Sequence, residues 1–208
     1  MNNRMIRTLT LCLLGVLLGS GIAWYQINGE ARSLNALTPT AGTAEPAMTV
    51  GGPFALTDHF GNPATEKSFP GLKLAFFGFT YCPDVCPAGL KKMSLALQEL
   101  GDDANQIAPL FITVDPERDT PDVLKEYVGL YDDRLTGLTG TPEQIKTTIE
   151  SFRVYAAKAE GADPENYMMN HSGYTYLLDD NGVMLTVFGP DESPAAMAKE
   201  IRDYLKQS

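Results

Sequence analysis

The stretch LKLAFFGFTYCPDVCPAGLKKMSLALQEL, residues 72–100, decides the fold of this chain. Residues 72–79 form a nearly continuous apolar run, as is typical of a strand buried on both faces of a sheet. Further on, leucine and methionine side chains recur at helical spacing until Gly101, a residue type that commonly ends a helix. Cys82 and Cys86 lie between the two halves. We therefore expect a central strand, a turn that carries two thiols and a long helix.

The segments on either side of this unit predict further strands and helices. A hairpin is expected around the Gly-Asn-Pro turn near the start of the domain, and another around the Asp-Asn-Gly turn near its end. Two Thr-Pro pairs are typical of helix starts, because threonine caps the helix and proline fits its first turn. The expected elements are a hairpin over 52–69, a buried strand over 107–115, helices from Thr120 and from Thr141 to about Arg153, a loop over 158–170, a hairpin over 173–189 and a final helix over 193–208.

This order predicts an α/β protein with a thioredoxin-like fold. A strand-helix-strand unit followed by an antiparallel hairpin and a helix gives a mixed central sheet flanked by helices, here preceded by an N-terminal β-hairpin. The two cysteines lie between the first central strand and the first long helix, where a thioredoxin-like protein keeps its chemistry.

The N-terminus has the pattern of a membrane anchor. Arg4 and Arg7 precede residues 8–29, which carry no charge and would span about 33 Å as a helix. A cleaved signal peptide is the competing interpretation, but Gly21-Ile22-Ala23 is a poor cleavage site. We expect an uncleaved anchor over 1–29, a linker over 30–50 and a thioredoxin-like domain over 51–208.

The charge pattern predicts where the domain lies and which partners it avoids. Because the arginines precede the apolar stretch, the positive-inside rule places the domain outside the cytoplasm, which for a single-pass protein of the bacterial inner membrane means the periplasm. The formal net charge is −10, from 26 acidic and 16 basic residues, which argues against nucleic acid as a partner. A 44% share of hydrophobic residues is enough for a packed core.

Three kinds of chemistry fit Cys82 and Cys86. Two neighbouring thiolates form a soft site for Cu(I) or zinc, and the same pair suits thiol–disulfide exchange. A structural disulfide is the third interpretation, since exported proteins commonly contain disulfides. We expect the N-terminus of the following helix to lower the thiol pKa values, because its free N–H groups favour negative charge.

His171 is the candidate for a third ligand. It precedes a predicted core strand, at a point that approaches the cysteines in a thioredoxin-like layout. An ordinary surface histidine is the competing interpretation. Met168 and Met169 are expected to pack within their loop rather than to ligate, and His59 is expected to be a solvated turn residue.

The motif DPERDT, residues 115–120, follows the second buried strand at the same sheet end as the cysteines. In one interpretation Asp119 or Thr120 caps the next helix and Arg118 forms a local ion pair. In the other, Asp115, Arg118 and Asp119 orient the metal ligands or a partner.

Four segments together resemble the Sco/SenC family of copper-binding assembly factors for cytochrome c oxidase. They are GFTYCPDVCP (78–87), LFITVDPERDT (110–120), YVGLYDDRLTGLTGT (127–141) and ENYMMNHSGYTYLLDDNG (165–182). The resemblance extends from about 51 to 206 and implies a thioredoxin-like fold behind one anchor helix. One departure is Tyr81, where many members of the family have histidine.

The resemblance also implies a function. Cys82, Cys86 and His171 would bind Cu(I) and Cu(II), and the copper would be delivered to the CuA centre of cytochrome c oxidase subunit II. Other periplasmic copper chaperones or thiol reductases are further expected partners. The alternative is a thiol–disulfide oxidoreductase that keeps the oxidase cysteines reduced, in which Cys82 and Cys86 would alternate between dithiol and disulfide. Only that alternative would make the chain an enzyme.

Overall fold

The computed structural model describes residues 49–159 and 167–207, together with Trp24. These two long segments belong to one compact unit, Met48–Ser208. The predicted anchor over 1–29 and the predicted linker up to residue 48 lie outside the described residues, except for Trp24. No helix among the described residues is long and apolar enough to cross a membrane.

A seven-stranded mixed sheet forms the centre of this unit, in the order β2-β1-β5-β4-β3-β8-β9. Its middle strands β3, β4 and β5 are parallel, β8 and β9 continue it antiparallel on one side, and β1 and β2 do so on the other. The strands are β1 (Ala55–Asp58), β2 (Pro63–Thr65), β3 (Leu72–Gly78), β4 (Ile107–Thr113), β5 (Thr136–Thr139), β8 (Thr175–Leu178) and β9 (Met184–Phe188).

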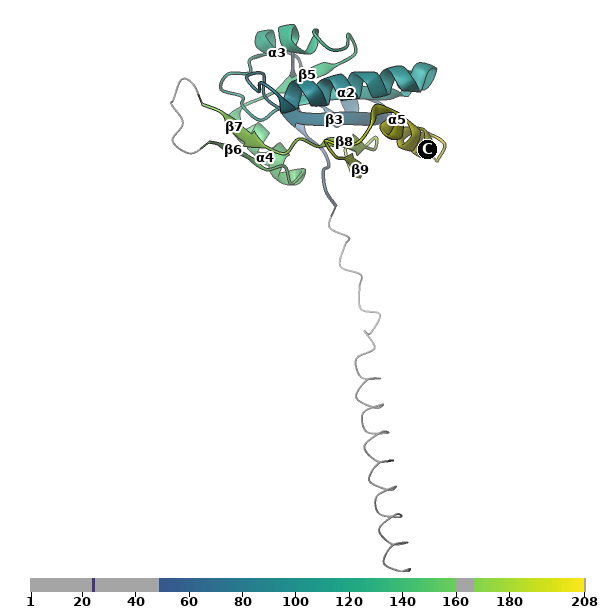
Figure 1. Ribbon diagram of the computed structural model, residues 1–208. Helices are drawn as coiled ribbons and strands as arrows, with labels where there is room; N and C mark the ends of the chain where they lie inside the picture. The colour runs from purple at the N-terminus through teal and green to yellow at the C-terminus, as the bar shows by residue number, and fades with distance from the viewer. Residues whose placement is uncertain (1–23, 25–48, 160–166, 208) are drawn as a thin grey trace, which may run out of the picture. The chain divides into compact units, whose positions relative to one another are not determined.

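Helices connect the parallel strands and cover the sheet (Figure 1). The long helix α2 leads from β3 to β4 and packs against the C-terminal helix α5. Thr120 and Thr141 each cap a helix with a side-chain oxygen and are followed by a proline, as the two Thr-Pro pairs predict. Ser193 caps the last helix in the same way. The helices are α2 (Val85–Leu100), α3 (Pro121–Val128), α4 (Pro142–Ser151) and α5 (Pro194–Leu205), with short 3₁₀ turns η1 (Glu66–Ser68) and η2 (Gly101–Gln106).

Strand β3 is buried along its whole length because both faces of the sheet are covered. Phe76 and Phe77 point to opposite faces, as neighbouring residues of a strand must. Phe76 packs so closely under α2 that a Cβ added at Gly89 would lie 2.4 Å from its ring. Phe77 contacts Phe152 at the end of α4, with ring centroids 5.2 Å apart. The predicted central strand and the thioredoxin-like α/β class are therefore confirmed.

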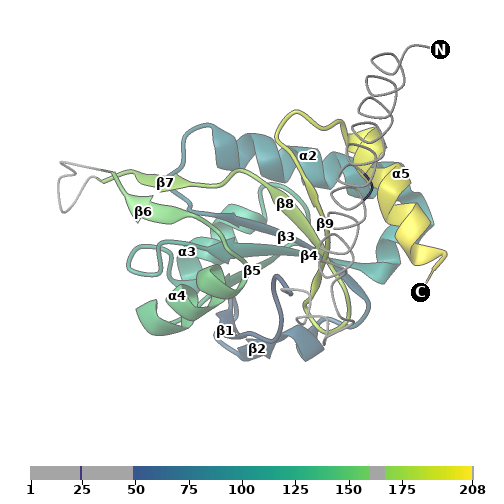
Figure 2. The ribbon, with the colours of Figure 1, turned by 90° about the horizontal axis from the view of Figure 1, so that it is seen from below.

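Two further strands form a small separate sheet (Figure 2). β6 (Ala156–Lys158) pairs antiparallel with β7 (Met169–His171), and β6 and β7 pair with no strand of the seven-stranded sheet. The prediction of a loop over 158–170 is wrong at both ends, because Lys158 and Met169 face each other in this ladder. Neither strand has the length or the alternating pattern that makes a strand visible in a sequence.

His59 is not the solvated turn residue that its Asp-His-Phe-Gly context indicates. Its side chain is only 8% exposed, and its Nδ1 accepts a hydrogen bond of 2.9 Å from the backbone N–H of Gly137. Burial lowers the pKa of His59, which favours the neutral ring that can accept this bond. The prediction fails because the β1–β2 turn lies beside the start of β5, a contact that the local sequence does not reveal.

Candidate metal centre

Cys82, Cys86 and His171 meet at the end of the sheet where β3 stops. One ligand atom from each lies within 4.8 Å of the other two, and Cys86 Sγ is 3.3 Å from His171 Nε2. Both cysteines are free thiols in this structure. Cys86 is fully buried, Cys82 is 8% exposed and His171 is partly exposed. Of the three side chains, His171 is therefore the most accessible to solvent and Cys86 the least.

The turn after β3 brings the two thiols together. The backbone N–H of Cys82 donates to the carbonyl of Phe79, which closes the turn, and α2 begins three residues later at Val85. The backbone N–H of Cys86 then points at Cys82 Sγ, at 3.4 Å. Gly78 leaves room for this arrangement, since a Cβ there would lie 2.6 Å from Cys86 Sγ.

The Nε2 atom of His171 faces the cysteines, at 3.3 Å from Cys86 Sγ. Its Nδ1 lies 3.1 Å from the carbonyl oxygen of Ser172. Because a carbonyl only accepts, this contact favours the neutral tautomer with its proton on Nδ1, in which Nε2 has the lone pair that histidine uses to bind metals. Burial lowers the pKa of His171, which also favours the neutral ring. The ring of Phe79 packs edge-on against the imidazole, with ring centroids 5.6 Å apart.

The thiol of Cys86 does not have the lowered pKa that its place near a helix start predicts. Burial raises its pKa far above the ordinary value, and the neighbouring Cys82 adds to the effect. The helix N-terminus is outweighed because the sulfur is completely removed from water. A bound cation would reverse this balance, since metal binding replaces the thiol proton.

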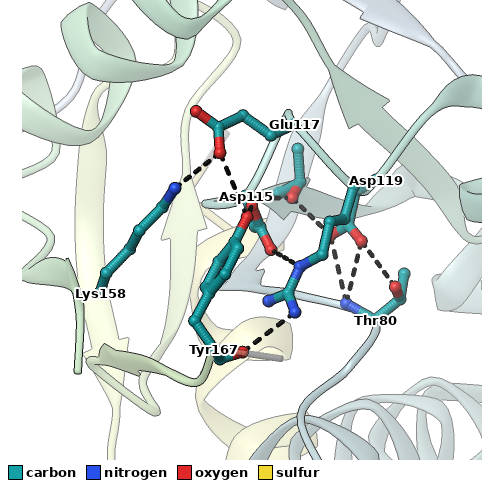
Figure 3. Close-up of polar contacts among 8 residues, drawn as sticks. Thr80, Asp115, Glu117, Asp119, Lys158 and Tyr167 are labelled. Atoms are coloured by element: carbon teal, nitrogen blue, oxygen red, sulfur yellow. Dashed lines mark hydrogen bonds and ion pairs between the residues drawn. The ribbon is translucent and has the colours of Figure 1, made fainter. Parts of the chain in front are cut away.

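The DPERDT loop forms polar contacts with Thr80 on one side and with Lys158 and Tyr167 on the other (Figure 3). Asp119 does not cap α3, a role that Thr120 fills. Its buried carboxylate instead accepts hydrogen bonds from the backbone N–H of Thr80 at 3.1 Å, the hydroxyl of Thr80 at 2.6 Å and the hydroxyl of Thr113 at 2.6 Å. Asp119 thus fixes the turn two residues before Cys82.

Arg118 and Asp115 connect to Tyr167, near the segment that carries His171. The predicted local ion pair is present, with Arg118 Nε 2.6 Å from Asp115 Oδ2. Asp115 also accepts a 2.6 Å hydrogen bond from the hydroxyl of Tyr167, and Arg118 donates to the Tyr167 carbonyl at 3.0 Å. Tyr167 and Thr80 were not among the site residues predicted from the sequence. The one available signal was that each lies within four residues of a candidate ligand.

The prediction that Met168 and Met169 pack within a loop holds only in part. Met169 lies in β7 and packs against the core, whereas Met168 is exposed, as is Tyr81. Among the His, Cys, Asp and Glu residues that the structure describes, the group placed to hold a metal ion consists of Cys82, Cys86 and His171. Two thiolates and one imidazole suit copper, whereas a structural zinc site needs four protein ligands.

Known proteins resemble this chain over most of its length. The SCO1/SenC family matches residues 42–206. A SCO2-like protein of Rickettsia felis is 44% identical over 164 residues, 78% of each chain, and the human mitochondrial SCO1 homolog is 39% identical over 166 residues, 76% of this chain and 55% of the human one.

Solved structures agree with these sequence matches. Bradyrhizobium japonicum ScoI with copper bound has a TM-score of 0.68 at 42% identity and covers 74% of this chain and 99% of its own. Yeast Sco1 with copper bound has a TM-score of 0.71 at 37% identity and covers 77% of this chain and 90% of its own. The fold, the cysteine pair beside His171 and these matches together show that the chain belongs to the SCO1/SenC family.

Proposed function

We propose that this protein is a copper chaperone for the assembly of cytochrome c oxidase. It binds Cu(I) and Cu(II) through Cys82, Cys86 and His171 and delivers copper to the CuA centre of oxidase subunit II. The observation that carries this proposal is the convergence of the three ligand atoms within 4.8 Å from segments 85 residues apart in the chain. The copper bound to the Bradyrhizobium and yeast relatives supports the choice of metal.

The donor set suits a protein that must hold copper in either oxidation state. Thiolates are the preferred ligands of Cu(I), and imidazole adds stability for Cu(II). Both thiols lose their protons when copper binds, so loading requires reduced cysteines and releases protons. The buried thiol of Cys86, whose pKa is strongly raised, makes this release a substantial part of the binding reaction.

Copper transfer proceeds by ligand exchange. Three protein ligands leave a coordination position that an acceptor thiolate can occupy. Cys82 and His171 lie nearer the surface than the fully buried Cys86, so the incoming ligand approaches on their side and Cys86 releases the copper last. No electron is transferred in this exchange, since one metal–sulfur bond forms as another breaks.

The test is copper loading of the purified, reduced protein under anaerobic conditions. We expect one copper per chain and, for Cu(II), thiolate-to-copper charge-transfer bands. Cys82→Ser, Cys86→Ser and His171→Ala should each abolish tight binding, while the control His59→Gln, at a histidine that bonds to Gly137, should bind like the wild type. A tight, stoichiometric site in any of the three ligand variants would contradict the three-ligand proposal.

The thiol–disulfide oxidoreductase remains the second candidate because two free cysteines lie side by side at the end of β3. It requires both cysteines but not His171. Disulfide reduction by the metal-free protein that His171→Ala leaves unchanged, combined with the absence of stable copper binding, would favour this function over the chaperone.

We also propose that residues 1–29 anchor the protein in the bacterial inner membrane, with the domain from residue 51 in the periplasm. The arginines before the uncharged residues 8–29 support this orientation. The protein should remain in the membrane fraction after a high-salt wash, and protease added to spheroplasts should degrade the domain. Recovery of the intact domain in the soluble cytoplasmic fraction would contradict both proposals.

A further inference from the structure

His171 lies on a hairpin that needs outside support. β6 and β7 are three residues each and pair only with one another among the described strands. A two-stranded hairpin is marginally stable by itself in water. Its position over the cysteines must therefore come from contacts with the rest of the domain.

The DPERDT loop supplies polar contacts to the hairpin, in addition to the packing of Met169 on the core and of Phe79 on His171. The Tyr167 hydroxyl donates to Asp115 at 2.6 Å, its carbonyl accepts from Arg118 at 3.0 Å, and Lys158 forms an ion pair of 2.6 Å with Glu117 (Figure 3). Lys158 ends β6, and Tyr167 lies two residues before β7. The loop therefore contacts the hairpin at the end of β6 and just before β7.

Arg118 extends this support to the cysteine turn. Its guanidinium carbon lies 3.6 Å from the ring centre of Tyr167 and 4.7 Å from that of Tyr81, the residue before Cys82. The Nη2 of Arg118 is buried and has no hydrogen-bond partner in the described part of the chain. A guanidinium stacked on aromatic rings gains cation–π attraction, which offsets the cost of this unpaired group.

The same loop is fixed to the cysteine turn a second time. Asp119 accepts three hydrogen bonds from Thr80 and Thr113, so the turn before Cys82 and the end of β4 share one buried carboxylate. Residues 115–119 thus contact the turn that carries the cysteines and the hairpin that carries His171. This loop therefore connects the two segments that carry the metal ligands.

We propose that Arg118 and Tyr167 are positioning residues that hold His171 at its distance from Cys82 and Cys86. This inference rests on the proposed copper site. Arg118 stacks beside one ligand segment and bonds to the other, and Tyr167 joins the hairpin to Asp115. Without them the two thiolates stay together, because both belong to one turn, but the imidazole loses its fixed place.

The test is a double-mutant cycle on copper binding by the full-length protein. Arg118→Ala should lower Cu(I) affinity by about 10- to 100-fold, the usual range for residues that orient metal ligands. In a His171→Ala background, where a weaker competitor measures the residual two-thiolate site, the same substitution should change affinity by no more than about twofold. The Cu(II) form of Arg118→Ala should also lose the nitrogen hyperfine signal in electron paramagnetic resonance.

Two milder variants and one control protect the test against simple misfolding. Tyr167→Phe keeps the stacked ring and removes the hydroxyl that bonds to Asp115 and Glu117. Arg118→Lys keeps the charge without the planar fork, so both variants should weaken copper binding. Arg134→Ala breaks an Arg–Asp ion pair of 2.8 Å with Asp132, outside these contacts, and should leave affinity unchanged.

The outcomes separate this inference from the function on which it rests. Equal losses with and without His171, or unchanged affinity and spectra in both Arg118 and Tyr167 variants, would overturn the positioning role while leaving the copper site intact. Failure of the wild-type protein to bind copper would instead overturn the proposed function.

Discussion

The substitution Gly78→Ala tests whether the close packing around Cys86 maintains the metal site. Gly78 is the last residue of β3, and a Cβ added there would lie 2.6 Å from Cys86 Sγ and 2.9 Å from Cε2 of Phe111. Ordinary contacts of a Cβ begin near 3.4 Å, so the sulfur must move by about 0.8 Å if it alone gives way. Phe76 closes a third side at 3.1 Å, which prevents the backbone from absorbing the shift freely.

The expected magnitude follows from this displacement. Adding a methyl group to a filled core costs about 1–3 kcal/mol of the free energy of unfolding. A binding site must hold its ligands within about 0.5 Å of their productive geometry, and the required shift of the Cys86 sulfur exceeds that tolerance. We therefore expect Gly78→Ala to fold, to lose about 1–3 kcal/mol of stability and to bind Cu(I) at least about 10-fold more weakly.

The assay combines urea denaturation of the metal-free protein with anaerobic competition for Cu(I) against a chelator of known affinity. Gly189→Ala is the matched control, because no atom lies within 4 Å of the Cβ it would add and its φ is not in the left-handed region. This control should match the wild type in both measurements. A Gly78→Ala protein with wild-type copper affinity would refute the reasoning, whatever its stability.

Three further substitutions test other features of the domain. His59→Gln keeps an acceptor for Gly137. Burial lowers the pKa of His59 below 6.5, so on acidification this histidine takes up a proton more readily in the unfolded chain than in the folded one. The wild type should therefore lose more stability than the variant between pH 7 and pH 5, as measured by urea denaturation. Parallel curves of stability against pH would argue against this. Lys73→Met should lower the free energy of unfolding by about 2 kcal/mol, since the fully buried ammonium donates to three backbone carbonyls, and an unchanged thermal midpoint would count against that role. Asp119→Asn should lower the free energy of unfolding by about 1–3 kcal/mol, because one of the two oxygens that accept from Thr80 and Thr113 becomes an NH₂ group that cannot accept. Stability equal to the wild type would show that the buried carboxylate is dispensable.

Much of the fold could be predicted because its signals are local. The apolar run over 72–79 corresponds to β3, the expected strand over 107–115 to β4, and the Asp-Asn-Gly hairpin to the antiparallel pair β8–β9. Each of these patterns reflects burial on one or both faces of a sheet, which fixes the type of residue along the strand. The β6–β7 sheet escaped prediction because three-residue strands hold too few residues to show a period.

The sequence predicted which residues form the candidate site but not how they are arranged. The spacing of Cys82 and Cys86 and their place before a helix identify the thiol pair, and the resemblance to the Sco/SenC family implies His171. Composition and spacing alone left the role of His171 open. Its tautomer depends on the Ser172 carbonyl, and its position depends on a hairpin that is held from a loop about 50 residues earlier in the chain.

The sequence by itself determined the central strands β3 and β4, the two Thr-Pro helix starts, the thiol pair and the family, because each depends on neighbouring residues or on a motif. Only the tertiary structure decided that His59 is buried, that the pKa of Cys86 is raised rather than lowered, and that Asp119 bonds to Thr80 instead of capping α3. Exposure to water and the identity of a distant hydrogen-bond partner are properties of packing. They arise only when segments far apart in the chain come together.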